Sequence, residues 1–223
     1  MPQTLTPPTS TTPTVPPRPP APLLLVGTIA AGPVFLAASL AQGLTREGFD
    51  FTRNALSQLS LGALGWIQVG FFLLTGLLVL AGAAGLRHAL RGGPGGVWAP
   101  RLIAVFGLSF LIAGVFTADP GAGFPPGTTE TGTGTLSGHG AVHMVAGTVG
   151  YLALCAAFPV LARAFAARGE RAWAVTTRLV PVAVIAGFAA SAATVAAFTA
   201  GAALGLLWLT AVGCRLRATT RRS

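Results

Sequence analysis

Long apolar runs alternate with short polar segments along the whole of this 223-residue chain. A bilayer core of about 30 Å is crossed by about 20 helical residues, and four of the runs are long enough to cross it. They cover residues 23–41, 64–86, 102–118 and 141–162. A single helix over the uncharged stretch 179–214 would be about 54 Å long, too long for one crossing. We therefore expect two spans there, at 179–197 and 201–214, joined by a turn near residues 199–201. The pattern predicts an all-α polytopic integral membrane protein, a bundle of six transmembrane helices.

Composition supports the membrane assignment. Hydrophobic residues make up 52% of the chain and charged residues 9%, whereas soluble domains carry about 25% charged residues. The net charge of +9 comes from arginine alone. These arginines lie at the edges of the apolar runs and form no basic face on a soluble domain, so no nucleic-acid partner is expected. Membrane lipids are the expected partners. No soluble partner can be identified, and the pattern does not define an oligomeric state.

The two ends of the chain differ from its middle. Residues 1–22 hold nine prolines and six threonines, a composition that cannot bury enough apolar surface to fold. We expect a disordered Pro/Thr-rich cytoplasmic tail there, with a ligand for a small recognition domain as the alternative. The membrane domain follows over 23–217, and 218–223 form a basic cytoplasmic tail. The first run is expected to remain as a helix, because no short basic segment precedes it as in a signal peptide.

The positions of the arginines predict the orientation. With both termini in the cytoplasm, 12 arginines lie inside and only Arg46 and Arg53 lie outside. The inside set is Arg18, Arg87, Arg91, Arg101, Arg163, Arg168, Arg171, Arg178, Arg215, Arg217, Arg221 and Arg222. Positive residues accumulate on the cytoplasmic side of membrane proteins. The sequence therefore predicts a multi-pass protein of the bacterial inner (cytoplasmic) membrane, with both termini cytoplasmic.

A polar segment between the third and fourth spans, residues 117–143, organises the predicted outer face. It holds Asp119, Glu130, His139 and His143 and contains no Lys or Arg. The first outer loop adds Arg53 and Ser57, beside Phe51, Leu56 and Leu59 at the spacing of a short interfacial helix. The candidate polar site consists of Arg53, Ser57, Asp119, His139 and His143.

Two kinds of chemistry fit these residues. His139 and His143 are four residues apart, which places both rings on one helix face, and Asp119 could complete a metal site of the hydrolytic zinc type. Alternatively Asp119, expected at a helix C-terminus where a carboxylate needs a cation, pairs with Arg53 while the histidines hydrogen-bond to loop carbonyls. A metal-free binding site is the third alternative.

The spans themselves carry hydroxyl groups but no charged side chain. The hydroxyl groups include those of Ser109, Thr148, Tyr151, Ser191 and Thr194. Charged residues at mid-membrane usually mark ion or proton pathways, so the pattern argues against a pump. Isolated hydroxyls in membrane helices most simply link neighbouring helices.

Two motifs connect the chain to a known family. The first is Phe51–Gly76 with Arg53, Leu56-Ser57, Leu59, Gly65-Trp66 and Gly76; the second is Gly114-Val115-Phe116, Asp119-Pro120, Pro125, Gly138-His139 and His143. Over residues 24–216 the chain resembles the bacterial six-helix membrane family filed as domain of unknown function 998. The resemblance implies a six-helix fold and no established activity.

A second similarity is limited to residue types. Ser57, Asp119, His139 and His143 are similar to the set that ceramidase-like membrane hydrolases use at a zinc site, although this chain has six predicted spans and lacks their third histidine. The expected function is a non-enzymatic membrane protein that binds a lipid or partner through an outward-facing polar site, with no cofactor. The alternative is a metal-dependent hydrolase, with zinc, acting on a lipid or amphiphile. The sequence is compatible with both functions.

Overall fold

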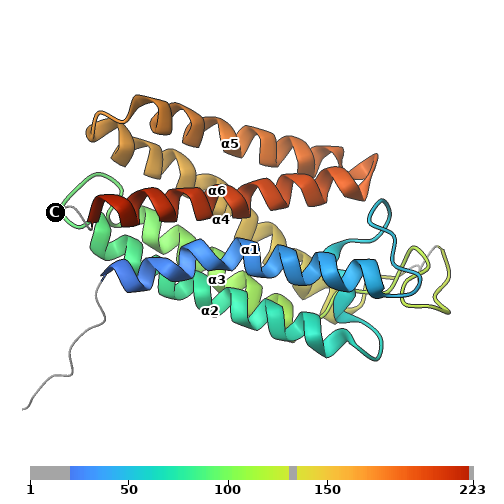
Figure 1. The fold of residues 1–223 in the computed structure, drawn as a ribbon. Helices are drawn as coiled ribbons and strands as arrows, with labels where there is room; N and C mark the ends of the chain where they lie inside the picture. The colour runs from blue at the N-terminus through green and yellow to red at the C-terminus, as the bar shows by residue number, and fades with distance from the viewer. Residues whose placement is uncertain (1–20, 131–134, 221–223) are drawn as a thin grey trace, which may run out of the picture.

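The computed structural model describes residues 21–130 and 135–220, and its long elements are all helices (Figure 1). They are α1 (Ala21–Thr45), α2 (Gly65–Ala89), α3 (Trp98–Val115), α4 (Gly138–Ala167), α5 (Arg171–Ala189) and α6 (Val195–Thr220). Each of the six is long and apolar enough to cross a membrane, so the predicted fold class is confirmed. The predicted tail 1–22 lies outside the described residues except for 21 and 22, which begin α1, and 221–223 also lie outside them.

The helices form a closed ring. Each packs against its neighbours in sequence, and α6 returns to pack against α1. Helix α5 lies at the edge of this ring, packed mainly against α4 and α6. In the most apolar 18-residue stretch of α5 only 22% of the residues are buried, whereas the figure for α3 is 50%. The ring therefore has a densely packed side, α1 to α3, and a side on which α5 and α6 lie more openly.

Glycines bring the helices of the dense side into backbone contact. A Cβ atom added at Gly82 of α2 would overlap Thr28 of α1, and one at Gly27 would overlap the Leu78 backbone. Between α2 and α3, a Cβ at Gly107 would lie 3.1 Å from the Gly76 carbonyl oxygen. Small residues of this kind allow membrane helices to approach closely where no hydrophobic force drives them together.

The boundaries of the last two helices differ from the prediction. The chain turns through a short 3-10 helix, η2 (Ala190–Ala192), so the expected turn at 199–201 lies inside α6. The hydroxyl of Thr194 accepts a hydrogen bond from the backbone N–H of Ala196 at 3.2 Å, which caps the first turn of α6. Helix α5 begins at Arg171 and α6 continues past Arg217, because long cationic side chains can keep their charge in water while their stems lie along a helix.

The two ends of the bundle have opposite character. One end holds the α1–α2 and α3–α4 loops and the α5–α6 turn, which project from the same side in Figure 1. The other holds the α2–α3 and α4–α5 connections and nine of the arginines in the described residues. There Arg215 bonds the Glu170 carboxylate at 2.6 Å. The predicted separation of arginines into two groups is thus a separation between two ends of one bundle.

Candidate functional site: a capped cavity

Two loops pack together over the arginine-poor end. We call them the loop cap, residues 46–64 and 116–137 without the undescribed 131–134. The side chain of Phe124 is fully buried between Phe49 and the guanidinium of Arg46, which lies 5.1 Å from the ring centre. Arg46 also donates hydrogen bonds to the carbonyls of Leu59, at 3.0 Å, and Leu61. Arg46 therefore joins the first loop to the second.

Amide side chains from the first loop bind the backbone of the second. Asn54 is 1% exposed and donates to the carbonyls of Gly121 and Ala122 at 3.3 Å. Gln58 donates to the Gly121 carbonyl at 3.2 Å. Gln58 belongs to the 3-10 helix η1 (Leu56–Ser60), which occupies part of the segment where an interfacial helix was predicted. These bonds hold η1 against the second loop of the loop cap, over the centre of the bundle.

Arg53 pairs with a different acid from the one predicted. Its guanidinium bonds the Glu130 carboxylate and the Ala122 carbonyl, the latter at 3.2 Å. Ala122 and Gly123 both have positive φ angles, 51° and 76°, in a tight turn from which the Ala122 carbonyl accepts bonds from Arg53 and Asn54. Because Arg53 pairs with Glu130 and not with Asp119, the predicted pair of Arg53 with Asp119 is wrong. The Arg53 and Glu130 side chains are 47% and 73% exposed.

Asp119 instead binds the N-terminus of α4. Its carboxylate accepts hydrogen bonds from the backbone N–H and the hydroxyl of Ser137, at 2.9 and 2.5 Å. The Ser137 hydroxyl in turn accepts from the Gly140 N–H. A Cβ at Gly140 would overlap the carboxylate, which explains a glycine inside the first turn.

The expectation that Asp119 faces an unfavourable helix C-terminus is therefore wrong. Helix α3 ends four residues earlier, at Val115, and a carboxylate beside a helix N-terminus is favoured by the helix dipole. The two hydrogen bonds from Ser137 lower the pKa of the Asp119 carboxyl below its usual value. This arrangement satisfies the carboxylate without a cation.

The two histidines of α4 lie in different surroundings. His139 is exposed, and its ring packs on Phe116 with 5.2 Å between centres. His143 is 6% exposed, and its Nδ1 donates to the carbonyls of Phe116, at 2.8 Å, and Ala113, at 3.2 Å. The hydrogen bond predicted from the histidines to loop carbonyls is thus present for His143 at Phe116, whereas Ala113 lies inside α3.

Each of the three predicted metal ligands has a separate partner. Asp119 binds Ser137, His139 packs on Phe116, and His143 bonds two carbonyls. Within the described residues, no group of three or more His, Cys, Asp or Glu side chains is placed to hold a metal ion.

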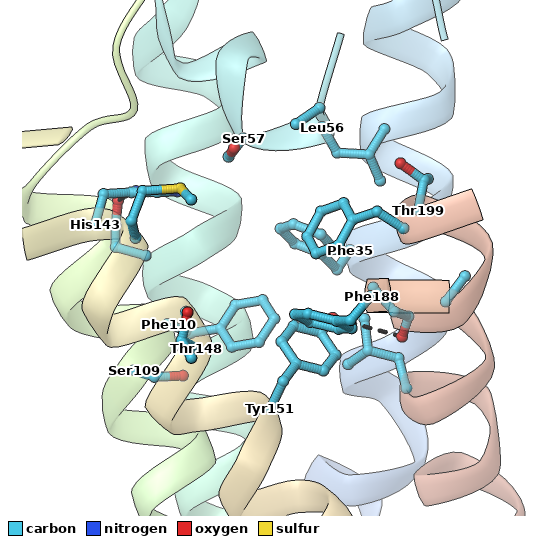
Figure 2. Close-up of a pocket in the computed structure, with 18 of the residues that line it drawn as sticks. Phe35, Leu56, Ser57, Ser109, Phe110, His143, Thr148, Tyr151, Phe188 and Thr199 are labelled. Atoms are coloured by element: carbon cyan, nitrogen blue, oxygen red, sulfur yellow. Dashed lines mark hydrogen bonds between the residues drawn. The ribbon is translucent and has the colours of Figure 1, made fainter. Parts of the chain in front are cut away.

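Beneath η1 the bundle encloses a cavity of about 320 Å³. Every helix of the ring contributes to its wall, with Figure 2 showing the main side chains. The apolar wall is formed by Phe35, Leu36, Leu56, Phe72, Phe110, Ala113, Met144, Phe188, Val195, Phe198, Ala202, Ala203 and Leu206. Tyr151 packs on Phe106 and Phe188 and lies with Phe188 below the cavity in Figure 2. Ser57 and His143 lie on the opposite side, towards the loop cap.

Few polar groups reach the cavity, and several of them have no protein partner. The hydroxyls of Ser57 and Thr148 make no hydrogen bond to any described residue, and the same holds for His143 Nε2. Tyr151 donates to the Ala202 carbonyl at 3.4 Å across the cavity floor. Ser109 bonds its own helix at Phe106, so the predicted role as a link between helices holds for Tyr151 but is wrong for Ser109.

The cavity opens sideways between α4 and the α5–α6 turn. Met144, Thr148 and Ser191 line it and are also exposed on the outer surface of the bundle, Met144 by 61%. Gly147 lines the same opening, and a Cβ added there would meet no atom within 4 Å. This surface lies along the span of α4, so the opening faces the region where lipid surrounds the helices.

The predicted site residues are thus divided between two places. Ser57 and His143 line the cavity, whereas Arg53, Asp119 and His139 lie outside its wall, in or beside the loop cap. Sequence reasoning missed the roles of Arg46, Asn54 and Gln58. Arg46 could have been recognised as a candidate from the sequence, because it is one of only two arginines at the arginine-poor end.

Comparison with known proteins supports the family resemblance. Residues 29–215 match the sequence model of the family DUF998, which is described as 'Protein of unknown function'. The chain therefore belongs to this family and is a polytopic membrane protein whose family description assigns no activity. No curated protein and no solved structure matches it.

Proposed function

We propose that this protein binds a membrane amphiphile in the capped cavity and carries out no chemistry on it. The observation that carries the proposal is the cavity itself. It is lined mainly by apolar and aromatic side chains, with a few hydroxyls and one imidazole. Small-molecule sites have volumes of about 300–1,000 Å³ and this kind of wall, and the sideways opening gives access from lipid.

The metal-dependent hydrolase has less support from the geometry. That mechanism would need Asp119, His139 and His143 to bind one ion with an open position for water. Each of the three already has a separate partner, and Asp119 and His139 lie outside the cavity wall. Binding without catalysis is therefore the function that the arrangement supports best.

We also propose that the loop cap faces outward and that both termini face the cytoplasm of a bacterial inner membrane. The support is the arginine asymmetry, 12 residues against two. Single cysteines at Thr52 and Gly92, in a background without Cys155 and Cys214, should react with impermeant reagent from opposite sides of the membrane. Labelling of Thr52→Cys only from the cytoplasmic side would show that the protein has the opposite orientation.

A pair of glycine substitutions tests the binding function. Gly147→Phe places a ring at the cavity opening, where there is space for it, and should reduce the amount of amphiphile that co-purifies with the protein and is detected by mass spectrometry. Gly70→Phe is the matched control, because Gly70 is exposed on α2 away from the cavity and also has no neighbour within 4 Å. Ala203→Phe blocks the cavity from the α6 wall.

The amount of bound amphiphile in the three variants distinguishes the possible outcomes. Loss of bound amphiphile in Gly147→Phe and Ala203→Phe, with normal amounts in Gly70→Phe, supports the cavity as the binding site. Equal amounts in all three variants and the original protein would show that the lipid is bound elsewhere. A purified protein that turns over an ester or amide of such an amphiphile would overturn the non-enzymatic part of the proposal.

A further inference from the structure

We infer that the occupant of the cavity is a neutral single-chain amphiphile whose head carries a hydroxyl group. This inference rests on the proposed function and adds the chemical class of the ligand. It follows from three features of the wall: its charge, its hydrogen-bonding groups and its size.

The wall offers no charged partner to an ionic head. None of the residues that line the cavity is Asp, Glu, Lys or Arg. The two arginines of the loop cap are engaged elsewhere, Arg46 with the Leu59 and Leu61 carbonyls and Arg53 with Glu130. Burying an ion without a partner is costly, so a carboxylate or phosphate head is disfavoured there.

The hydrogen-bonding groups require a head that both donates and accepts. His143 Nδ1 donates to the carbonyls of Ala113 and Phe116, and in this tautomer Nε2 carries the lone pair that can accept a hydrogen bond. The Ser57 hydroxyl lies on the same side of the cavity and can donate or accept. A hydroxyl head can donate to one of these groups and accept from the other, which an ester or ether oxygen cannot do.

The size and the opening define the tail. A volume of about 320 Å³ is at the lower end of the range for small-molecule sites, so it cannot enclose both chains and the head of a phospholipid. One chain can lie against Tyr151 and Phe188 at the aromatic floor. The opening between Met144 and Ser191 lets the rest of the chain remain in lipid.

Three ligands with the same oleoyl chain test the inference. Protein in phosphatidylcholine nanodiscs is titrated with radiolabelled monooleoylglycerol, and oleic acid and oleoyl lysophosphatidic acid at neutral pH are used as competitors. We expect saturable binding of monooleoylglycerol at one site, with each anion competing at least about tenfold more weakly. Gly147→Phe should abolish the saturable binding, and Gly70→Phe should leave it unchanged.

A second set of variants tests the head contact. Ser57→Ala should weaken monooleoylglycerol binding about two- to tenfold, the range expected for one hydrogen bond. Its thermal unfolding should stay unchanged, because the hydroxyl has no partner among the described residues. Ser60→Ala is the comparison variant in the same 3-10 helix, since Ser60 does not line the cavity. Its hydroxyl donates to the Ser57 carbonyl at 2.6 Å, so this change should lower the unfolding temperature and leave the binding affinity unchanged. Met144→Arg, with a cation at the opening, should shift the preference towards oleate.

Two failures have different meanings. If the anions compete as well as or better than monooleoylglycerol and Gly147→Phe blocks them, the charge class inferred here is wrong but the cavity still binds amphiphiles. If none of the three ligands shows saturable binding that Gly147→Phe removes, both this inference and the proposed function are overturned. Unchanged affinity in Ser57→Ala would overturn the placement of the head.

Discussion

Glycines of the helical ring are used in two opposite ways. Close contact is not confined to one side, since a Cβ at Gly187 of α5 would lie 2.7 Å from the Ala197 carbonyl oxygen of α6. On the α1–α2–α3 side, Gly27, Gly76 and Gly82 lie where a Cβ atom would overlap a neighbouring helix. On the side facing the α5–α6 turn, Gly147 lies where a Cβ would meet nothing within 4 Å. The first arrangement removes space between helices, and the second leaves it. The comparison shows that a glycine-rich membrane helix indicates neither close packing nor a cavity until its neighbours are known.

Two groups of aromatic residues border the cavity. Phe35 packs edge to face on Phe72 and Phe110, which are tilted against each other, and the three rings, with centres 5.1–5.6 Å apart, form part of the cavity wall. Tyr151 and Phe188, at 5.3 Å, form its floor and hold α4 to α5. Large flat side chains hold the helices apart above this floor, so the void is bordered by rigid groups on two sides.

The largest expected effect is at Gly82. Gly82→Leu should lower the stability of the protein by about 3 kcal/mol, because the new side chain overlaps the backbone of Thr28. Thermal unfolding in detergent measures this as a lower midpoint. Gly70→Leu, on the same helix with open space around it, is the control. Equal midpoints for the two variants would show that α1 and α2 do not pack as described.

Changes at the N-terminus of α4 should have an intermediate effect. Asp119→Asn removes the charge that accepts from Ser137 and should cost about 1 kcal/mol, discounted because the site is largely exposed. The folded-state pKa is depressed, so this contribution is present above the usual value of about 3.9 and is lost as the pH falls through the lower folded value. Below that pH, unfolding of Asp119→Asn and the original protein should coincide. A difference that persisted there would assign the effect to something other than the carboxylate.

The same alanine substitution should have opposite effects on stability at an open glycine and at a close-packed one. Gly147→Ala should raise stability by about 0.5–1 kcal/mol, because alanine is the better helix former and nothing obstructs its methyl group. Gly76→Ala should lower stability, because its Cβ would lie 2.8 Å from the Gly107 carbonyl oxygen. Chemical or thermal unfolding of the pair measures the difference. A loss of stability in both variants would contradict the contrast between the two glycines.

The smallest expected effect is at Arg53. Arg53→Gln should change stability by less than about 1 kcal/mol, because its ion pair with Glu130 is exposed on both sides. Arg46→Gln should cost more, since it removes two hydrogen bonds to carbonyls and the contact with the Phe124 ring. A calorimetric comparison of the two variants tests this order. The reverse order would mean that Arg53, not Arg46, joins the two loops.

The number and type of helices could be predicted because hydropathy alone decides which residues lie in lipid. Helix ends could not, because hydrogen bonds set them. Thr194 caps α6 and Ser137 caps α4, and both lie away from the edges of the apolar runs.

The candidate site was predicted only in part for related reasons. Charge counting placed Arg53 and Asp119 at the same end of the bundle, but the turn at Ala122–Gly123 and the hydroxyl of Ser137 decide their partners. The cavity depends on how far apart Phe35 of α1 and Phe188 of α5 lie. No local pattern encodes this separation, since it is set by the packing of the whole ring.

The uncharged α5–α6 turn has a consequence for how the protein enters the membrane. Between Ala189 and Val195 the chain carries no acidic or basic group, so translocating this turn through the hydrocarbon core requires no ion to be desolvated. The two helices can then be inserted together as a hairpin, driven by their own hydrophobicity and anchored by the arginines at their far ends. In the orientation proposed above, the α3–α4 loop, in contrast, must carry Asp119 and Glu130 across the membrane. During biosynthesis the hairpin is thus the part of the chain that can join the bundle last at the lowest cost, closing the ring after the first four helices are in place.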